Sequence, residues 1–192
     1  MAGVKEIVAG FRLRFHLRTY QASPISLPED MRNTRNVMIC LPPGQRELTM
    51  IKQLLPELAR IFSDSEIYLL AAPGSPVYEI FPRKGYRILT PSSDQLTWSG
   101  LAKTAYINLL KQNRFDLILD LNLSPSHFVK SILLAFPRAI RAGAGGNLGI
   151  PYYNLEIKSG YLRDEKNIYR SIINMIAQLR ENKSTKFDET AN

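Results

Sequence analysis

The chain has 192 residues, of which 45% are hydrophobic and 22% are charged, a composition typical of a globular protein with one domain of ordinary size. It carries 25 Lys and Arg against 17 Asp and Glu, and the formal net charge of +8 favours anionic partners such as nucleic acid, acidic lipid or phosphorylated sugar. The basic residues are scattered and the sequence has neither zinc-finger spacing nor an aromatic RNA-binding signature, so nucleic acid is the least favoured of these partners.

Several features limit where the protein works and what it carries. No apolar run reaches the ~18 residues of a membrane-spanning helix, and the first residues lack the continuous apolar core of a secretory signal, so we expect a cytoplasmic protein. The single cysteine, Cys40, lies in an apolar run and is interpreted as a small buried hydrophobic residue. With only His16 and His127 and no paired Cys or carboxylate motif, we expect no metal and no cofactor.

Residues 1–35 are predicted to be a basic N-terminal extension and linker, in which Pro24 and Pro28 mark the linker. The stretch 4–18 mixes apolar and basic side chains. On a helix one face would carry Val4, Ile7, Val8, Phe11 and Phe15. Residues 11–18 also alternate between apolar and basic, which suits a strand equally well. Two roles stay open for this stretch. One is packing or disorder, and the other is contact with an anionic membrane surface, which would associate the protein with the inner face of the membrane.

Residues 36–181 are predicted to form a Rossmann-like α/β domain of three layers with a mainly parallel sheet, and residues 182–192 a polar tail. The predicted strands are apolar throughout, which is typical of a parallel sheet covered on both faces. Strands are expected at 36–41, 66–71, 86–89, 115–121 and 139–143, with a short sixth at 152–157. Helices are expected at 47–62, 99–113, 124–136 and 164–180, with a helical turn at 77–81.

Polar residues follow the strand predicted at 115–121, and open parallel sheets bind their ligands beyond the carboxyl ends of the strands. Asp120 is a weak catalytic candidate, and Asn122, Ser124 and Ser126 are candidate ligand-binding residues. The alternative is that one of the two serines caps the next helix.

A glycine-rich stretch follows the strand predicted at 139–143. Gly143 and Gly145 could bring backbone amides near a phosphate, and Arg141 beside them could meet an anionic ligand. The alternative is a turn with positive backbone angles. The stretch is not a dinucleotide fingerprint, because Pro151 and not a helix follows it.

Three stretches carry a family resemblance. Residues 54–59 read Leu-Leu-Pro-Glu-Leu-Ala before the strand at 65–70, and residues 114–122 read Arg-Phe-Asp-Leu-Ile-Leu-Asp-Leu-Asn. Residues 139–143 read Ala-Ile-Arg-Ala-Gly, and a helical stretch follows at 167–179. In this order they resemble the N-terminal, acceptor-side domain of glycosyltransferase family nine, the lipopolysaccharide heptosyltransferases. The middle stretch is similar to the family's Tyr-Asp-Leu-Val-Ile-Asp-Leu-Gln strand.

The resemblance implies a GT-B glycosyltransferase of lipopolysaccharide biosynthesis, in which a second domain holds the nucleotide-sugar donor. The family's Gly-Asp pair after the first strand is thought to supply the general base. Here those positions hold Thr49 and Met50, or Gln45 when Gly44 is aligned with the glycine, and Met and Gln do not accept a proton at neutral pH. Glu47 is the nearest carboxylate and a weak candidate to replace the base; its alternative role is to interact with the helix dipole.

The favoured hypothesis is therefore a heptosyltransferase-like N-terminal domain without independent glycosyl transfer, which binds a sugar or glycolipid through residues such as Gly44 or works with a partner. Two alternatives stay open. One is an active glycosyltransferase subunit completed by a second chain or by a homodimer. The other is a membrane-surface interaction protein that uses residues 4–18.

Overall fold

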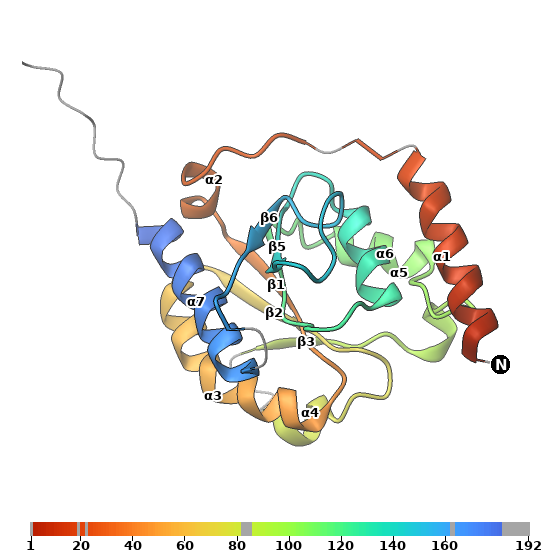
Figure 1. The fold of residues 1–192 in the computed structure, drawn as a ribbon, viewed down its shortest axis with the longest axis horizontal. Helices are drawn as coiled ribbons and strands as arrows, with labels where there is room; N and C mark the ends of the chain where they lie inside the picture. The colour runs from red at the N-terminus through yellow and green to blue at the C-terminus, as the bar shows by residue number, and fades with distance from the viewer. Residues whose placement is uncertain (1, 19, 22, 82–85, 162–163, 182–192) are drawn as a thin grey trace, which may run out of the picture.

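A computed structural model describes residues 2–18, 20–21, 23–81, 86–161 and 164–181. Within them six parallel strands form one sheet in the order β3-β2-β1-β4-β5-β6, flanked by helices on both faces (Figure 1). The strands are β1 (Asn36–Cys40), β2 (Glu66–Leu70), β3 (Arg87–Leu89), β4 (Leu117–Asp120), β5 (Ile140–Ala144) and β6 (Leu155–Ile157). The predicted Rossmann-like α/β fold with a mainly parallel sheet is confirmed.

The strand order reverses between β1 and β4. β1 pairs with β2 on one side and with β4 on the other, and its last residue, Cys40, lies in register with Asp120 at the end of β4. The connections that leave these two strands therefore diverge, one toward each half of the sheet. In open parallel sheets this point of divergence, at the carboxyl edge, is where ligands bind.

The two faces of the sheet are covered by different helices. On one face lie α3 (Gln45–Ile61), the short α4 (Val77–Ile80) and α7 (Glu165–Glu181), and on the other lie α5 (Thr104–Lys111) and α6 (His127–Ala135) (Figure 1). The helices pack because their apolar residues recur at helical spacing. In α3 the buried residues are Leu48, Ile51, Leu54, Leu55 and Leu58, and in α7 Tyr169, Ile172, Ile173 and Ile176. Each fully buried aliphatic side chain contributes about 1.5–3 kcal/mol relative to exposure.

The predicted start of one helix was wrong by more than one helical turn. The helix predicted at 99–113 begins at Thr104, because the residues before it close a tight turn. The amide of Leu101 donates to the Thr97 hydroxyl at 3.0 Å, and Leu101 O accepts from the Thr97 amide at 2.8 Å. Gly100 takes a positive φ of 81° in this turn, a conformation that interrupts a helix.

The N-terminal segment is ordered in the part that the structure describes. α1 (Ala2–Arg18) is helical along its whole length, which excludes the strand alternative, and it packs on α6 through Ala9 and Leu13. The predicted linker contains a second helix, α2 (Glu29–Arg32), whose Met31 is fully buried in the core beneath α7. No helix among the described residues is both long and apolar enough to cross a membrane. The predicted tail at 182–192 lies outside the described residues.

Candidate functional site

Asp120, at the end of β4, is the centre of a buried polar cluster at the carboxyl edge. It is 1% exposed, and both of its carboxylate oxygens accept hydrogen bonds. Tyr153 Oη donates to Oδ2 at 2.7 Å, while the amide and Nδ2 of Asn122 donate to Oδ1 at 2.9 and 2.7 Å. Burial raises the pKa of Asp120 above its usual value, although these hydrogen bonds act to lower it. The carboxylate thus organises the loop after β4, and its burial shields it from a ligand in solution.

Gly143 makes this cluster possible. It lies on β5 in register with Asp120, and a Cβ atom on it would overlap the ring of Tyr153. Only glycine therefore lets Tyr153 pass over β5 and reach the carboxylate. Asn147 closes the arrangement, because its Nδ2 donates to Asn122 O at 2.8 Å and lies 3.3 Å from Tyr153 Oη. The loops after β4 and β5 are thereby joined.

The rest of the glycine-rich loop is a turn. Gly146 and Gly149 have positive φ angles of 82° and 67°, as the turn interpretation requires. Gly145 is less constrained, since an added Cβ would come within 3.1 Å of Lys158 Cγ only, a side-chain atom that can shift. Strand β6 and not a helix follows this loop, so its amides do not form the start of a helix that would hold a phosphate.

Gly44 and Glu47 lie at the N-terminus of α3, beside the switch point. Gly44 is the N-cap residue with extended backbone, and an added Cβ on it would overlap the carboxylate of Glu47. Glu47 therefore folds back over the first turn of its own helix, where a negative charge interacts favourably with the helix dipole. Glu47 therefore occupies the position expected for the helix-dipole role, the alternative to base catalysis.

The other predicted site residues lie apart from the Asp120 cluster. Ser126 is the N-cap of α6 and accepts from the Val129 amide at 3.4 Å, while Ser124 is exposed. Arg141 is 1% exposed and points into the layer below α6, where it donates to Pro151 O at 2.9 Å. Its guanidinium lies 5.1 Å from the ring of Tyr20, and burial lowers the pKa of Arg141. Arg141 thus holds the N-terminal segment and does not face the carboxyl edge.

Several buried polar groups at the carboxyl edge have no hydrogen-bond partner among the described residues. Among the described residues, five buried side-chain atoms in or beside its loops make no hydrogen bond: Ser75 Oγ, Thr90 Oγ1, Tyr106 Oη, Asn147 Oδ1 and Tyr169 Oη. Ser75 and Thr90 follow β2 and β3, and Asn147 follows β5. Buried polar groups in native proteins are nearly always satisfied by protein, ordered water or ligand. Unpaired buried atoms also occur on Tyr20, His127, Arg141 and Glu165 among the described residues, and the five at this edge are candidate contacts for a polar ligand.

Two of these groups are tyrosines that approach the switch point from opposite helix layers. Burial raises the pKa of Tyr106, on α5, and the proximity of Cys40 raises it further. Burial also raises the pKa of Tyr169, on α7, with further contributions from the charges of Glu47 and Asp120. Both phenols are therefore protonated at neutral pH, and each has an O–H to donate.

Sequence reasoning missed these tyrosines because they recur at core spacing in their helices and read as packing residues. Thr90 was accessible to prediction, since it begins the loop after a predicted strand. Cys40 was predicted correctly: its thiol is buried, and burial raises its pKa well above the usual value, which removes it as a nucleophile.

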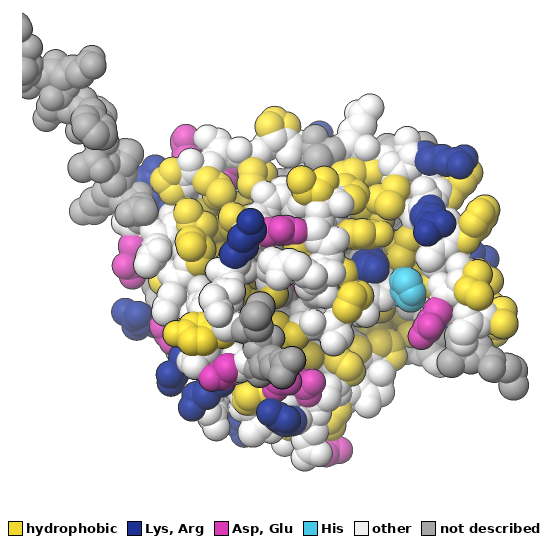
Figure 2. All heavy atoms as spheres, in the orientation of Figure 1, with side chains coloured by type: hydrophobic (Ala, Val, Ile, Leu, Met, Phe, Trp, Pro, Cys, Tyr) yellow, Lys and Arg dark blue, Asp and Glu magenta, His cyan; other side chains and the backbone are white. Residues whose placement is uncertain are grey.

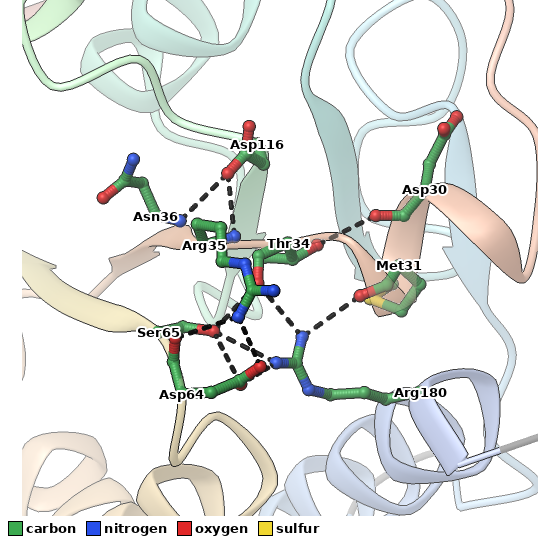
Figure 3. A network of polar contacts seen from close by, with 9 residues as sticks. All are labelled: Asp30, Met31, Thr34, Arg35, Asn36, Asp64, Ser65, Asp116 and Arg180. Carbon is green, nitrogen blue, oxygen red and sulfur yellow. Dashed lines mark hydrogen bonds and ion pairs between the residues drawn. The ribbon is translucent and has the colours of Figure 1, made fainter.

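The amino edge of the sheet, opposite the switch point, is held by a network of charged groups (Figure 3). Arg180, from α7, donates to Met31 O at 3.1 Å and Ser65 Oγ at 3.1 Å, and pairs with Asp64. Arg35 donates to the same carboxylate at 2.7 Å. A cavity of about 1030 Å³ also opens on this edge, between the N-terminal segment and residues such as Lys111, Arg114 and Arg138.

The structure thus brings Asp120, Asn122 and Gly143 into one cluster, places Gly44 and Glu47 at the neighbouring helix start, and separates Arg141 from both. In the described residues no group of His, Cys, Asp and Glu has the arrangement of a metal site. The chain matches no protein-family model, no curated protein and no solved structure. Its geometry is therefore the basis for a functional proposal.

Proposed function

We propose that the chain is a heptosyltransferase-like binding module that holds a sugar or glycolipid at the carboxyl edge of its sheet. The observation that carries this proposal is the set of buried polar groups on that edge without hydrogen-bond partners among the described residues. Four are hydroxyls, which both donate and accept, and the fifth is an amide oxygen, which accepts. A sugar presents alternating donors and acceptors and complements such a set.

Two further features support a sugar as the ligand. The strand order reverses beside Cys40 and Asp120, and ligands of open parallel sheets bind at such a reversal. The net charge of +8 favours an anionic form of the ligand, such as a sugar phosphate or the phosphorylated sugar of a glycolipid. The Asp120 cluster supplies a rigid floor beneath this edge, because it fixes the loops after β4 and β5 to each other.

We propose binding without independent glycosyl transfer. A general base must come within hydrogen-bond reach of the hydroxyl that it deprotonates. Asp120 is buried with both oxygens occupied, and Glu47 is folded against the first turn of α3. Neither carboxylate is placed to act as that base.

Isothermal titration of the chain tests this function. Sugar phosphates and a lipopolysaccharide-type glycolipid are expected to bind, whereas nucleotide-diphosphate sugars are not expected to bind tightly and transfer activity is expected to be absent. Failure of every sugar and glycolipid to bind would overturn the proposal, and so would micromolar binding of a nucleotide sugar accompanied by transfer.

Tyrosine variants place the ligand on this edge. Tyr106→Phe and Tyr169→Phe each remove one hydroxyl, and each is expected to weaken binding by roughly fivefold to tenfold, the value of one hydrogen bond. Tyr86→Phe makes the same chemical change at a residue that directly precedes β3, at the amino edge of the sheet, and it is the matched control. Equal binding by all three variants would mean that the ligand does not bind at the carboxyl edge.

A further inference from the structure

Helix α1 has two apolar faces, and the larger side chains are on the outer one. Ala9 and Leu13 are buried, at 0% and 3% exposed, against Leu101 and the helix α6. The opposite face carries an apolar stripe of four residues that are 56%, 72%, 73% and 65% exposed: Val4, Ile7, Phe11 and Phe15. A contiguous exposed stripe with two phenylalanines is unusual on a protein surface and marks an interaction site.

Basic residues border this stripe on both sides. An α-helix advances about 100° per residue, which places Lys5 and Arg12 along one border and Arg14 along the other, with Arg18 at the C-terminal end of the stripe itself. All four side chains are exposed, and Glu6 is the one acidic residue among the described residues of α1. Figure 2 shows Lys and Arg side chains among hydrophobic ones along the rim where Figure 1 places α1.

The apolar surface continues beyond the helix. A groove of about 760 Å³ between α1 and the start of α5 is lined by Phe11, Phe15, Leu101 and Ala102, with Arg12 at its margin. Beside it Trp98 is 63% exposed, and Lys5 Nζ lies 5.8 Å from the centre of its ring. Tryptophan and lysine side by side are typical of the boundary between lipid headgroups and acyl chains.

We propose that α1 is a peripheral membrane anchor that lies in the plane of an anionic lipid bilayer, with Phe11 and Phe15 inserted at the acyl boundary and the bordering cations among the headgroups. Charge complementarity selects this occupant, because three cations flank the stripe, a fourth ends it, and anionic lipid neutralises them. Ala9 and Leu13 hold the helix on the domain while its outer face binds.

A second copy of the chain fits the stripe less well. In a two-fold dimer the same surface meets itself, and cations that border both sides would face cations of the partner. The exposed lining of the groove is also mostly apolar, which suits an acyl chain. This inference goes beyond the sugar-binding proposal and does not depend on it, since the stripe and the carboxyl edge share no residue.

Vesicle co-sedimentation of the full chain tests the anchor. We expect binding to phosphatidylcholine vesicles that contain about one-third phosphatidylglycerol, little binding to pure phosphatidylcholine, and a decrease as salt is added. The double variant Phe11→Ser/Phe15→Ser should bind roughly tenfold or more weakly, because both apolar anchors are lost. Their exposure means that the substitutions leave the fold intact, which thermal unfolding of the variant checks.

Charge variants distinguish binding through the stripe from a general attraction of the basic protein to anionic lipid. Lys5→Gln/Arg12→Gln should weaken binding by about twenty-fivefold, since each basic residue near the surface contributes roughly fivefold. Lys111→Gln/Arg138→Gln removes the same charge from exposed positions on the amino edge and should have a small effect. Equal losses in the two double variants, or no vesicle binding at all, would overturn the anchor. A dimer in light scattering that dissociates in the Phe11→Ser/Phe15→Ser variant would also overturn it, in favour of self-association.

Discussion

The two edges of the sheet differ in how completely their polar groups are paired. At the amino edge the polar groups of the network in Figure 3 are paired: Asp64 with two arginines, and Asp116 with the amides of Arg35 and Asn36 at 2.8 and 3.0 Å. At the carboxyl edge Asp120 is fully bonded, but Tyr106 and Tyr169 approach it with hydroxyls that have no partner among the described residues. The amino edge serves stability, whereas the carboxyl edge keeps polar groups without partners among the described residues, as the proposed binding site requires.

The ionisation of the two carboxylates shows the same contrast. Desolvation acts to raise the pKa of Asp64, but the charge and hydrogen bond of Arg180 outweigh it and lower that pKa overall. Desolvation dominates at Asp120 and raises its pKa. One carboxylate is stabilised in its charged form by the fold, and the other is destabilised.

The largest expected effect concerns the floor of the carboxyl edge. Gly143→Ala places a methyl group inside the ring of Tyr153, which is 1% exposed and has no room to withdraw without losing Asp120. We expect the free energy of unfolding to fall by about 3 kcal/mol, from overpacking and a lost hydrogen bond. Urea denaturation measures it. Gly145→Ala, two residues later, should cost much less, because only the flexible side chain of Lys158 must move.

The next effect concerns the amino edge. Arg180→Ala removes a side chain that is 10% exposed, together with its hydrogen bonds to Met31 O and Ser65 Oγ and one of the two arginine partners of Asp64. The free energy of unfolding should fall by about 2–3 kcal/mol. Arg170→Ala, on the exposed side of the same helix, should change it by less than about 0.5 kcal/mol. If Arg180→Ala abolished sugar binding while the protein stayed folded, the division of roles between the edges would be wrong.

A smaller effect is expected on the pH dependence of the free energy of unfolding. The lowered pKa of Asp64 means that its contribution to stability is present above its unfolded pKa, of about 4, and is lost as the pH falls through the folded value. The raised pKa of Asp120 gives the opposite sign: its contribution is present below the unfolded pKa and is lost as the pH rises through the folded value.

Denaturation of Asp64→Asn and Asp120→Asn across the acid range measures these slopes. The stability difference between the wild type and Asp64→Asn should shrink on acidification, and the wild type should gain relative to Asp120→Asn over the same range. Glu79→Gln, exposed on α4, corrects for the loss of one carboxylate. If the free energy of unfolding of the two Asp variants changed with pH at the same slope, the contrast between the edges would be wrong.

The sequence predicted the sheet well and the site in part, for physical reasons. Strands that are apolar on both faces are recognisable from the sequence. A helix such as α7 is recognisable too, because its isoleucines recur every four residues. Asp120 was found because it ends the strongest strand. Its engagement by Tyr153 was not foreseeable, since that contact depends on a missing Cβ 10 residues earlier, at Gly143. The outward turn of Phe11 was also hidden, because a sequence does not show which of two apolar faces packs.

The smallest expected effect separates two tyrosines of the same edge. Tyr153 Oη donates to Asp120, so Tyr153→Phe should lower the free energy of unfolding by about 1–2 kcal/mol. Tyr169 Oη has no partner among the described residues, so Tyr169→Phe should leave stability unchanged or raise it by up to about 1 kcal/mol, because it removes an unpaired buried hydroxyl. Chemical denaturation measures both variants under one condition. A gain in stability at Tyr169 together with weaker sugar binding would show that the fold keeps this hydroxyl for a ligand, whereas a loss of stability as large as that of Tyr153→Phe would mean that an ordered water already satisfies it and that it is a structural group.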